Sequence, residues 1–359
     1  MRPLPLVLTL ALVTPALAWG DRGHEIVNRA AARALPPEVP ACLRERVARL
    51  TWLGPEPDRW RDRDLPEMNR AYAPDHFVDF EWTDMIDHDR PPPDRYAYAH
   101  ALREGGRKPE QTGFAPYTVV ELCQRIEAAL VAIEMLDPAH PEAAERRAQA
   151  EEALVYVAGT LGHYVADLAN PHHTTIHYNG WVGENPHGFA TDKGTHARFE
   201  SVFVSRVGAQ LDALVQVRDR PRVDLDYARA IWSFVRESHG QLEELYRLDR
   251  DGAFAEGSDP ARGTAFASQR MVRGATLLRD LWATACHRGA LRAAATRLRS
   301  TILTALEAAE VEVWVDVDLE KRVLLRGRLD DPARHARALA IVRAVPGVTG
   351  LVTKVRVLY

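Results

Sequence analysis

The sequence predicts a mainly α-helical domain followed by a small α/β domain, and two observations support this. Apolar residues recur at helical spacing through much of residues 22–287, where no segment alternates as a strand does. From about residue 311 onward, short β-branched runs flank one helical segment. With 359 residues, 46% of them apolar, the chain is long enough to bury one large core and a smaller one. We therefore place a domain boundary near residue 289.

The first 18 residues are typical of a secretory signal peptide. Arg2 gives a positive start, residues 3–15 form a short apolar run, and Ala16-Leu17-Ala18 fits the small-x-small rule for cleavage. The run is too short to span a bilayer as a mature anchor. Cleavage after Ala18 predicts an exported mature chain that begins at Trp19, in the periplasm or outside the cell.

The helical domain is expected to span residues 19–289. We expect helices at about 22–35, 116–136, 142–169, 196–215, 225–246 and 265–287. Pro116 suits a first helical turn, and Asn170-Pro171 stops the third helix. Between residues 174 and 195 a loop rich in Gly, Asn and Pro is expected.

The tail, residues 290–359, has a different pattern. A helix at about 290–309 is followed by strand-like segments at 311–317, 322–327 and 348–358, with a helix expected at 331–344. These elements predict a compact α/β unit.

Charge and cysteine content exclude some classes of protein. The net charge of −4 arises from 46 basic and 50 acidic residues, so no strong electrostatic field indicates a dedicated nucleic-acid-binding protein. The three cysteines, Cys42, Cys123 and Cys286, cannot form a complete disulfide framework and lack metal-type spacing.

Two pairs of residues share a format that suits a metal ion. His163 and Asp167 lie four residues apart near the end of one expected helix, and His196 and Glu200 repeat this spacing at the start of another. Side chains four residues apart leave the same face of a helix, so each pair can bind one divalent ion without bending the backbone. Zinc accepts both imidazole nitrogen and carboxylate oxygen.

Further candidate ligands lie upstream. A processed chain start would free the α-amine of Trp19, which together with its own carbonyl oxygen can chelate a metal near His24. Asp58 and His76 would add a carboxylate and an imidazole, with Asp62 as a rival to Asp58. A nearby acid, Asp79, is a candidate to orient the imidazole of His76.

These motifs resemble the superfamily that joins zinc-dependent phospholipase C to the single-strand-specific zinc nucleases. The resemblance runs from Trp19 to about residue 285 and includes a Trp at the mature start, a His soon after, an Asp and a His-Phe step. It continues with two spaced motifs, His163-x3-Asp167-x5-His173 and His196-x3-Glu200. The ten-residue separation from His163 selects His173 rather than His172.

The resemblance implies a helical fold with three zinc ions. One site would use Asp58, His76, His163 and Asp167; a second the Trp19 amine and carbonyl, His24 and the shared Asp167; a third His173, His196 and Glu200. Asp58 and Asp167 would take part in catalysis. Bound zinc lowers the pKa of water to about 7, which predicts phosphodiester hydrolysis by a metal-activated hydroxide without a Ser or Cys nucleophile.

The substrate is less sharply defined. The short spacing from Trp19 to His24 and the gap from His173 to His196 resemble the nuclease branch. Glu200 in place of Asp resembles the phospholipase branch. Aromatic residues of the 176–189 loop suit either a stacked nucleobase or an acyl or head group.

The tail resembles a BON domain over about residues 295–359, a family associated with phospholipid surfaces in the cell envelope. This implies a possible membrane-surface contact through the C-terminal domain and favours phospholipid hydrolysis over a single-strand nuclease or 3′-nucleotidase activity. A non-catalytic, metal-stabilised envelope protein is a third hypothesis.

Overall fold

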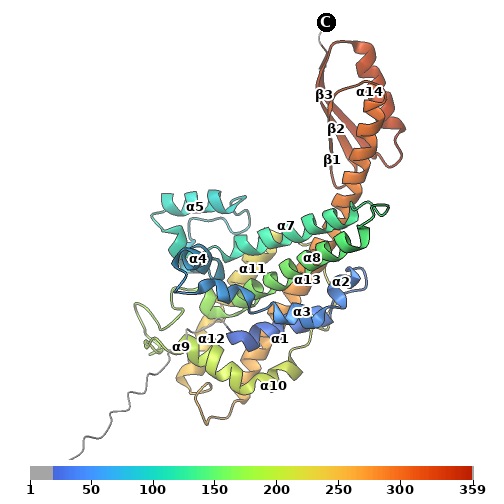
Figure 1. Cartoon of the computed structure of the whole chain (residues 1–359). Helices are drawn as coiled ribbons and strands as arrows, with labels where there is room; N and C mark the ends of the chain where they lie inside the picture. Colours follow the sequence, from blue (N-terminus) through green and yellow to red (C-terminus); the bar gives the residue numbers. More distant parts are fainter. Residues whose placement is uncertain (1–18, 358–359) are drawn as a thin grey trace, which may run out of the picture.

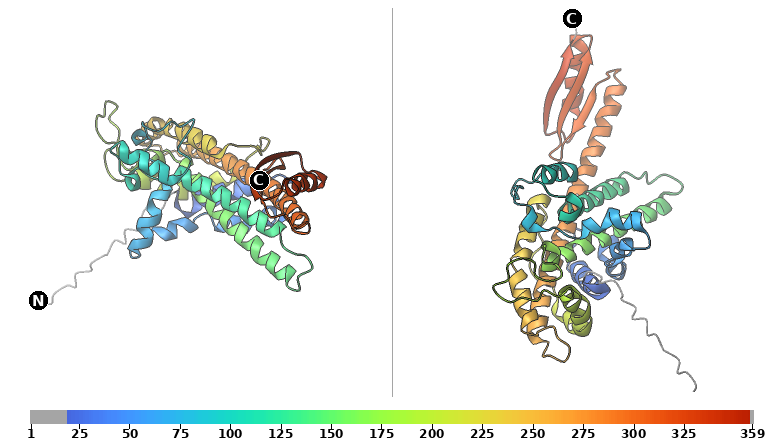
Figure 2. Two further views of the ribbon diagram at one scale, coloured as in Figure 1. Left: turned by 90° about the horizontal axis from the view of Figure 1, so that it is seen from above. Right: turned by 90° about the vertical axis from the view of Figure 1, so that its left-hand side faces the viewer.

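The computed structural model describes residues 19–357, so the predicted signal peptide lies outside the described residues. This part of the chain is mainly helical, with one three-stranded sheet near its C-terminal end (Figures 1 and 2). The predicted mainly α class with a small strand-containing tail is therefore confirmed. Among residues 19–357, no helix is both long and apolar enough to cross a membrane.

The larger part consists of helices joined by turns and by longer loops, including residues 83–94 and 175–194. Its helices are α1 (Gly20–Arg33), α2 (Ala41–Arg44), α3 (Val47–Trp52), α4 (Pro66–Tyr72), α5 (Arg95–Glu104), α6 (Pro109–Thr112), α7 (Ala115–Glu134), α8 (Ala143–Ala169), α9 (Thr195–Ala197), α10 (Val204–Leu214), α11 (Tyr227–His239), α12 (Leu242–Arg250) and α13 (Ala261–Glu307). Short 3-10 turns are η1 (Glu56–Arg61), η2 (Ala73–His76), η3 (Phe80–Trp82) and η4 (Pro171–Thr174), and η5 (Arg198–Phe203) is π-helical.

Local sequence determines where the main helices begin and end. Pro116 stands in the first turn of α7, where its missing N–H costs nothing. Asp226 caps α11 by accepting a hydrogen bond from the backbone N–H of Arg229. Helix α8 ends at Ala169 because Pro171 disfavours a helical conformation at Asn170. The expected helices at 116–136 and 142–169 are thus confirmed to within two residues at each end.

The core of this part lies between α1, α7, α8 and α13, which pack side by side. The helices α1 and α8 approach closely at Gly162 of α8, where a Cβ would lie 1.9 Å from the Oδ1 atom of Asn28. The buried Asn28 amide donates hydrogen bonds to the carbonyls of Leu50 and Gly159. Glycine at position 162 therefore allows α1 to pack against α8.

Two expected helix boundaries were wrong. The segment 225–246 forms two helices, because the chain turns at Gly240 between α11 and α12. Conversely, the expected helices at 265–287 and 290–309 form the single 47-residue helix α13, which ends at Glu307. Gly289 does not break this helix, because it lies against α7, where a Cβ would come within 2.9 Å of Leu130. Helices α2 to α6 were not predicted from the sequence.

The tail forms a second hydrophobic core around the C-terminal end of α13. Strands β1 (Trp314–Val317), β2 (Arg322–Leu329) and β3 (Gly350–Val357) pair in that order, β1 antiparallel and β3 parallel to β2. Helix α14 (Pro332–Ala344) connects β2 to β3 and packs on the same face of the sheet as α13. The predicted strands and helix of the tail are confirmed, and residue 289 lies in α13 between the two cores.

Candidate metal centre

The structure brings the predicted ligands together from separate segments. Among the described residues, three groups of His, Asp and Glu side chains each have candidate ligand atoms within 4.8 Å of one another. They are His24, Asp58 and His163; His76, His163 and Asp167; and His173, His196 and Glu200. All of these residues are buried except the partly buried His196.

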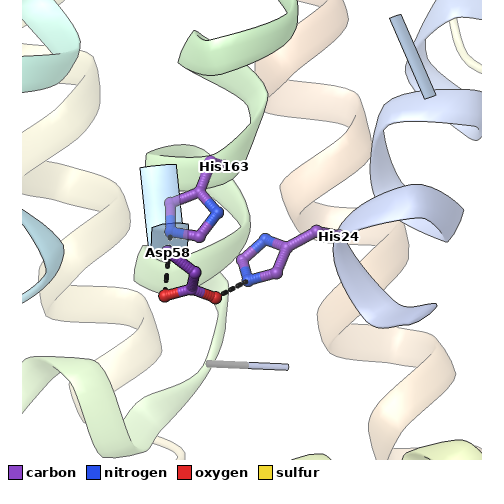
Figure 3. A group of neighbouring side chains, drawn as sticks. All are labelled: His24, Asp58 and His163. Carbon is purple, nitrogen blue, oxygen red and sulfur yellow. Dashed lines mark ion pairs between the residues drawn. The ribbon is translucent and has the colours of Figure 1, made fainter. Parts of the chain in front are cut away.

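In the first group, two imidazole rings and a carboxylate face one another (Figure 3). His24 comes from α1, Asp58 from the turn η1 and His163 from α8. The Asp58 carboxylate oxygens lie 3.9 Å from Nε2 of His24 and 3.8 Å from Nε2 of His163. The two rings are stacked, with centroids 4.0 Å apart. The distances between the carboxylate and the two imidazoles are too long for direct hydrogen bonds, so they better suit a cation shared by the three side chains.

The second group surrounds Asp167 on α8. Its Oδ2 atom lies 3.0 Å from Nδ1 of His76 and 3.2 Å from Nε2 of His163, one turn earlier on the same helix. Its Oδ1 atom lies 3.5 Å from Nε2 of His24 and 3.8 Å from Nδ1 of His173. Because its two oxygens face different imidazoles, Asp167 connects the first two groups, as expected of a bridging carboxylate.

The third group lies where η4 meets α9 and η5. Glu200 lies within the π-helical stretch η5, a distortion often found at functional sites. Its Oε1 atom lies 2.7 Å from Nε2 of His196, and its Oε2 atom lies 3.4 Å from Nε2 of His173. The Nε2 atoms of the two imidazoles lie 3.2 Å apart. Three candidate ligand atoms therefore converge on one point, and the partly exposed His196 opens it toward solvent.

Backbone carbonyls fix the orientation of two imidazoles. Nδ1 of His163 donates to the carbonyl of Gly54 at 2.8 Å, and Nδ1 of His173 donates to the carbonyl of His76 at 2.8 Å. Each bond leaves Nε2 directed at the candidate metal position, an arrangement that metal-binding histidines usually show. Sequence reasoning expected Asp79 to orient His76, but no hydrogen bond joins these two side chains among the described residues.

The backbone nitrogen of Trp19 is directed at the third group. It donates to Oε2 of Glu200 at 3.0 Å, while the Trp19 carbonyl accepts from the N–H of Gly23 at 3.1 Å. The buried indole donates to the carbonyl of Ala166. Trp19 therefore reaches the site, although no hydrogen bond joins it to His24 in the described chain.

Burial and mutual contact set the protonation states of the first two groups. Burial lowers the pKa of His24 to about 3, which keeps this imidazole neutral at pH 7. Burial also raises the pKa of Asp58 to about 6. Burial acts against an ionised Asp167 as well, but His163 and His173 hold its pKa well below the usual range. A charged carboxylate and a neutral imidazole are the forms that bind a metal.

The third group keeps its charges in the same way. Burial opposes ionisation of Glu200, yet His196 and His173 hold its pKa below the usual value. Burial lowers the pKa of His173, but Asp167, Glu200 and the His76 carbonyl together outweigh it and raise that pKa to about 9. Protons on imidazoles thus offset the carboxylates, and a divalent ion would displace these protons.

Buried polar atoms without partners test whether a cation fits. Among the described residues, these include both ring nitrogens of His24, Oδ2 of Asp58, Nε2 of His76 and Oδ1 of Asp167. Each unsatisfied buried group costs about 1–3 kcal/mol. Orphaned imidazole nitrogens beside orphaned carboxylate oxygens form a donor set that suits a divalent cation, so buried clusters able to hold metal ions are confirmed.

Several neighbouring residues lie outside the three groups. Asp62 is exposed and accepts a hydrogen bond from the Asp64 N–H, so Asp58 rather than Asp62 reaches the first group. His172 is buried and packs against the ring of His196 with centroids 5.0 Å apart, but it belongs to none of the three groups. Sequence reasoning missed Asn170, whose amide donates to Oε2 of Glu200 at 2.8 Å. In the sequence, the position of Asn170 before Pro171 predicted only the end of a helix.

Comparisons with known proteins add no assignment. No protein-family model matches the chain, and no curated protein matches it.

Proposed function

We propose that this chain is an exported phosphodiesterase that uses zinc ions bound by the three groups. The convergence of three ligand groups, from segments spread between residues 24 and 200, is the observation that carries this proposal. Zinc held there would supply Lewis acidity and lower the pKa of water, so that a nucleophile exists near neutral pH. The same ions would offset negative charge on a phosphodiester.

The roles of the chain's own residues follow from their positions. Asp167 would bridge two ions through oxygens that face different imidazoles. Burial raises the pKa of the Asp58 carboxyl to about 6, so this group would release its proton near neutral pH as it takes up an ion. His196 stands at the exposed side of the third group, where a substrate oxygen can approach. Thiol catalysis is disfavoured, because burial raises the pKa of Cys286 to about 12.

A cavity of about 660 Å³, lined by residues of η3, α11, α12 and the loop before α9, favours a phospholipid head group as the substrate. One of its lining residues, His239, donates to the carbonyl of Thr174, the residue after His173. Glu81 lines it and accepts hydrogen bonds from the hydroxyl of Thr175 and the N–H of Ile176.

The lining of this cavity is acidic and aromatic. Three glutamates line it together with a single arginine, Arg247, which pairs with Glu243 and Glu244 at 2.6 and 3.2 Å. The third glutamate, Glu81, lies 3.8 Å from Nδ1 of His239. Trp181 also lines it, and its indole stacks on the imidazole of His177 with the ring centroids 4.0 Å apart. An acidic lining repels the phosphates of a polynucleotide, whereas it attracts the amine of a zwitterionic head group.

A nuclease or 3′-nucleotidase is the second candidate, and one observation favours it. Tyr178 is 55% exposed, and its ring centroid lies 6.3 Å from that of His196. An exposed ring at this position suits stacking of a nucleobase beside the metal centre.

The decisive experiment compares substrates on the mature, zinc-loaded protein. Phosphatidylcholine vesicles, single-stranded DNA, RNA and a 3′-nucleotide are each incubated with the protein and with Asp167→Asn. We expect lipid head-group release by the unaltered protein, reduced at least a hundredfold by Asp167→Asn. Cleavage of nucleotides with inert lipid would select the nuclease instead. Zinc binding without any hydrolysis would support the non-catalytic envelope protein.

The acidic cavity has its own test. Glu81→Gln keeps the shape of the side chain and removes its charge, so we expect a higher KM for zwitterionic lipid with little change in kcat. Glu110→Gln, on an exposed part of the helical domain, is the matched control. A KM that is the same in both variants would argue against this cavity as the head-group site.

A further inference from the structure

The loop 175–194 has a small hydrophobic core of its own. Its buried Phe189 packs against Leu242 and Tyr246 of α12, and Trp181 of the loop packs against the same cluster. None of these four side chains belongs to the main core of the helical domain. Satellite cores of this kind occur under long loops. Helix α12 is therefore the support on which this loop is built.

Tyr246 joins α12 to the first half of the loop. Its hydroxyl donates to the carbonyl of His177 at 2.6 Å and accepts from the N–H of Gly180 at 3.1 Å, so both functions of the hydroxyl are used. Its ring packs against those of Trp181 and Phe189, with centroids 5.3 and 5.4 Å away. Tyr246 is 1% exposed, so water cannot readily take the place of either partner.

The loop folds back on itself at the point that Tyr246 holds. Gly180 has a φ of 110°, and a Cβ there would lie 2.8 Å from the backbone oxygens of Thr191 and Asp192. The next residue, Trp181, donates its N–H to the carbonyl of Ala190 at 2.8 Å. A hydrogen bond to Gly180 thus fixes both halves of the loop, because the second half lies directly against the first.

The same tyrosine reaches the third metal group through the ring of His172. The centroid of His172 lies 5.9 Å from that of Tyr246 and 5.0 Å from that of His196. On the exposed side of His196 stands Tyr178, two residues before Gly180, with its ring centroid 6.3 Å away. This contact explains why a buried imidazole, His172, lies outside the three groups: it packs between Tyr246 and a candidate ligand.

We infer that Tyr246 is a positioning residue that holds the loop 175–194 beside the third group, so that Tyr178 and the cavity meet the substrate in one arrangement. The inference deepens the proposed function and rests on it for the substrate, whereas the hold on the loop requires no hydrolysis. A loop that is ordered before the substrate arrives loses less conformational freedom on binding. The hydroxyl of Tyr246 should therefore lower KM and leave kcat nearly unchanged.

The test uses the full mature, zinc-loaded chain and two Tyr→Phe variants. Tyr246→Phe keeps the ring and leaves the carbonyl of His177 and the N–H of Gly180 without their partner. The control is Tyr98→Phe, because Tyr98 is also buried in the helical domain and its hydroxyl has no hydrogen-bond partner among the described residues. Circular dichroism spectra and melting temperatures establish that each variant folds.

Opening of the loop is measured by the rate at which chymotrypsin cuts after Phe189, identified by mass spectrometry. Phe189 is 3% exposed, so this cut requires the loop to leave α12. The rate of such a cut follows the population of the open form. Loss of two hydrogen bonds of ordinary net strength should raise that population about tenfold or more.

We expect Tyr246→Phe to be cut after Phe189 about tenfold faster than the unaltered protein. Its KM for the substrate that the unaltered protein cleaves should rise about tenfold, with kcat within about twofold and with unchanged zinc content. The control should match the unaltered protein in all of these. Equal rates of cutting in the two variants would overturn the inference, and so would equal KM values.

The hold on the loop can be tested apart from catalysis and apart from the variant. If the unaltered protein cleaves no phosphodiester, the proposed function alone fails, and the rate of cutting decides the inference. If Tyr246→Phe does not fold, hydrogen exchange of the unaltered protein decides it. The amide of the buried Gly180 should exchange about tenfold or more slowly than that of the exposed Gly183, and equal exchange at these two glycines would overturn the inference.

Discussion

Removal of divalent ions is the perturbation that tests the metal centre most directly. The three ligand groups place carboxylates and imidazoles in a region that water barely reaches, and several of their atoms have no partner in the described chain. A chelator would remove the ions, so that like charges within these groups repel one another and several of their polar atoms lack hydrogen-bond partners. We therefore expect EDTA to lower the melting temperature of the mature protein substantially.

The size of the effect follows from the number of groups. A ligand at about 100 times its Kd stabilises the folded state by about 2.7 kcal/mol per site, so three sites give about 8 kcal/mol. A large domain gains about 2–4 °C for each kcal/mol. Chelation should thus lower the melting temperature by about 15–30 °C, and added zinc should restore it.

Differential scanning fluorimetry with and without EDTA measures this shift, and two variants locate its origin. Asp167→Asn removes the charge that joins the first two groups, so at most about a third of the shift should remain. Asp212→Asn removes a carboxylate that pairs with Arg29 of α1, outside the three groups, and should keep the full shift. A melting temperature that ignores EDTA, or an unchanged shift in Asp167→Asn, would refute the reasoning.

Three further predictions concern single positions. A mature chain that starts at Trp19 should bind more zinc, by elemental analysis, than one with an extra Met before it, because the buried Trp19 nitrogen lies 3.0 Å from Glu200; equal zinc content would remove the amine from the site. Gly162→Ala should cost about 2–4 kcal/mol in urea unfolding, since a Cβ would displace the buried Asn28 from its two carbonyl partners; a loss below 1 kcal/mol would contradict this close packing. Burial, with a smaller contribution from Glu81, raises the pKa of Asp79 to about 8 from about 3.9 in the unfolded chain, so stability should fall as pH rises between these values. The variant Asp79→Asn should therefore have a higher melting temperature than the unaltered protein at pH 8.5 and the same melting temperature near pH 4. Equal melting temperatures at both pH values would show that ionisation of Asp79 does not destabilise the fold.

The sequence predicted which side chains gather into the three groups better than it predicted the helices around them. The spacing of His163 and Asp167 on one helix is a local property, and the structure keeps both side chains on one face of α8. Asp58 could be separated from Asp62 only in three dimensions, because η1 buries the first and exposes the second. Which group the Trp19 nitrogen faces likewise depends on how α1 packs, and no spacing along the chain contains that information.

The helix predictions failed where tertiary packing outweighs the local preferences of the sequence. Two helices were expected on either side of residue 289, and a glycine in a helix interior costs about 1 kcal/mol. In the structure Gly289 lies against Leu130 of α7, so packing of the two helices outweighs the local preference. The short helices α2 to α6 have too few residues to show a clear apolar period, and they depend on the surrounding core for stability.

Packing of the metal centre also explains why so many charged groups can remain buried. Helix α1 contains His24 and Asn28, and Trp19 directly precedes it. The small residue Gly162 allows α1 to pack closely against α8. Helix α8 in turn carries both His163 and Asp167, so the same close contact that completes the core also sets the distance between the first ligand groups. A cation that offsets the buried carboxylates would therefore stabilise the packing of α1 on α8, and loosening of that packing would weaken the binding of the cation by the same free energy.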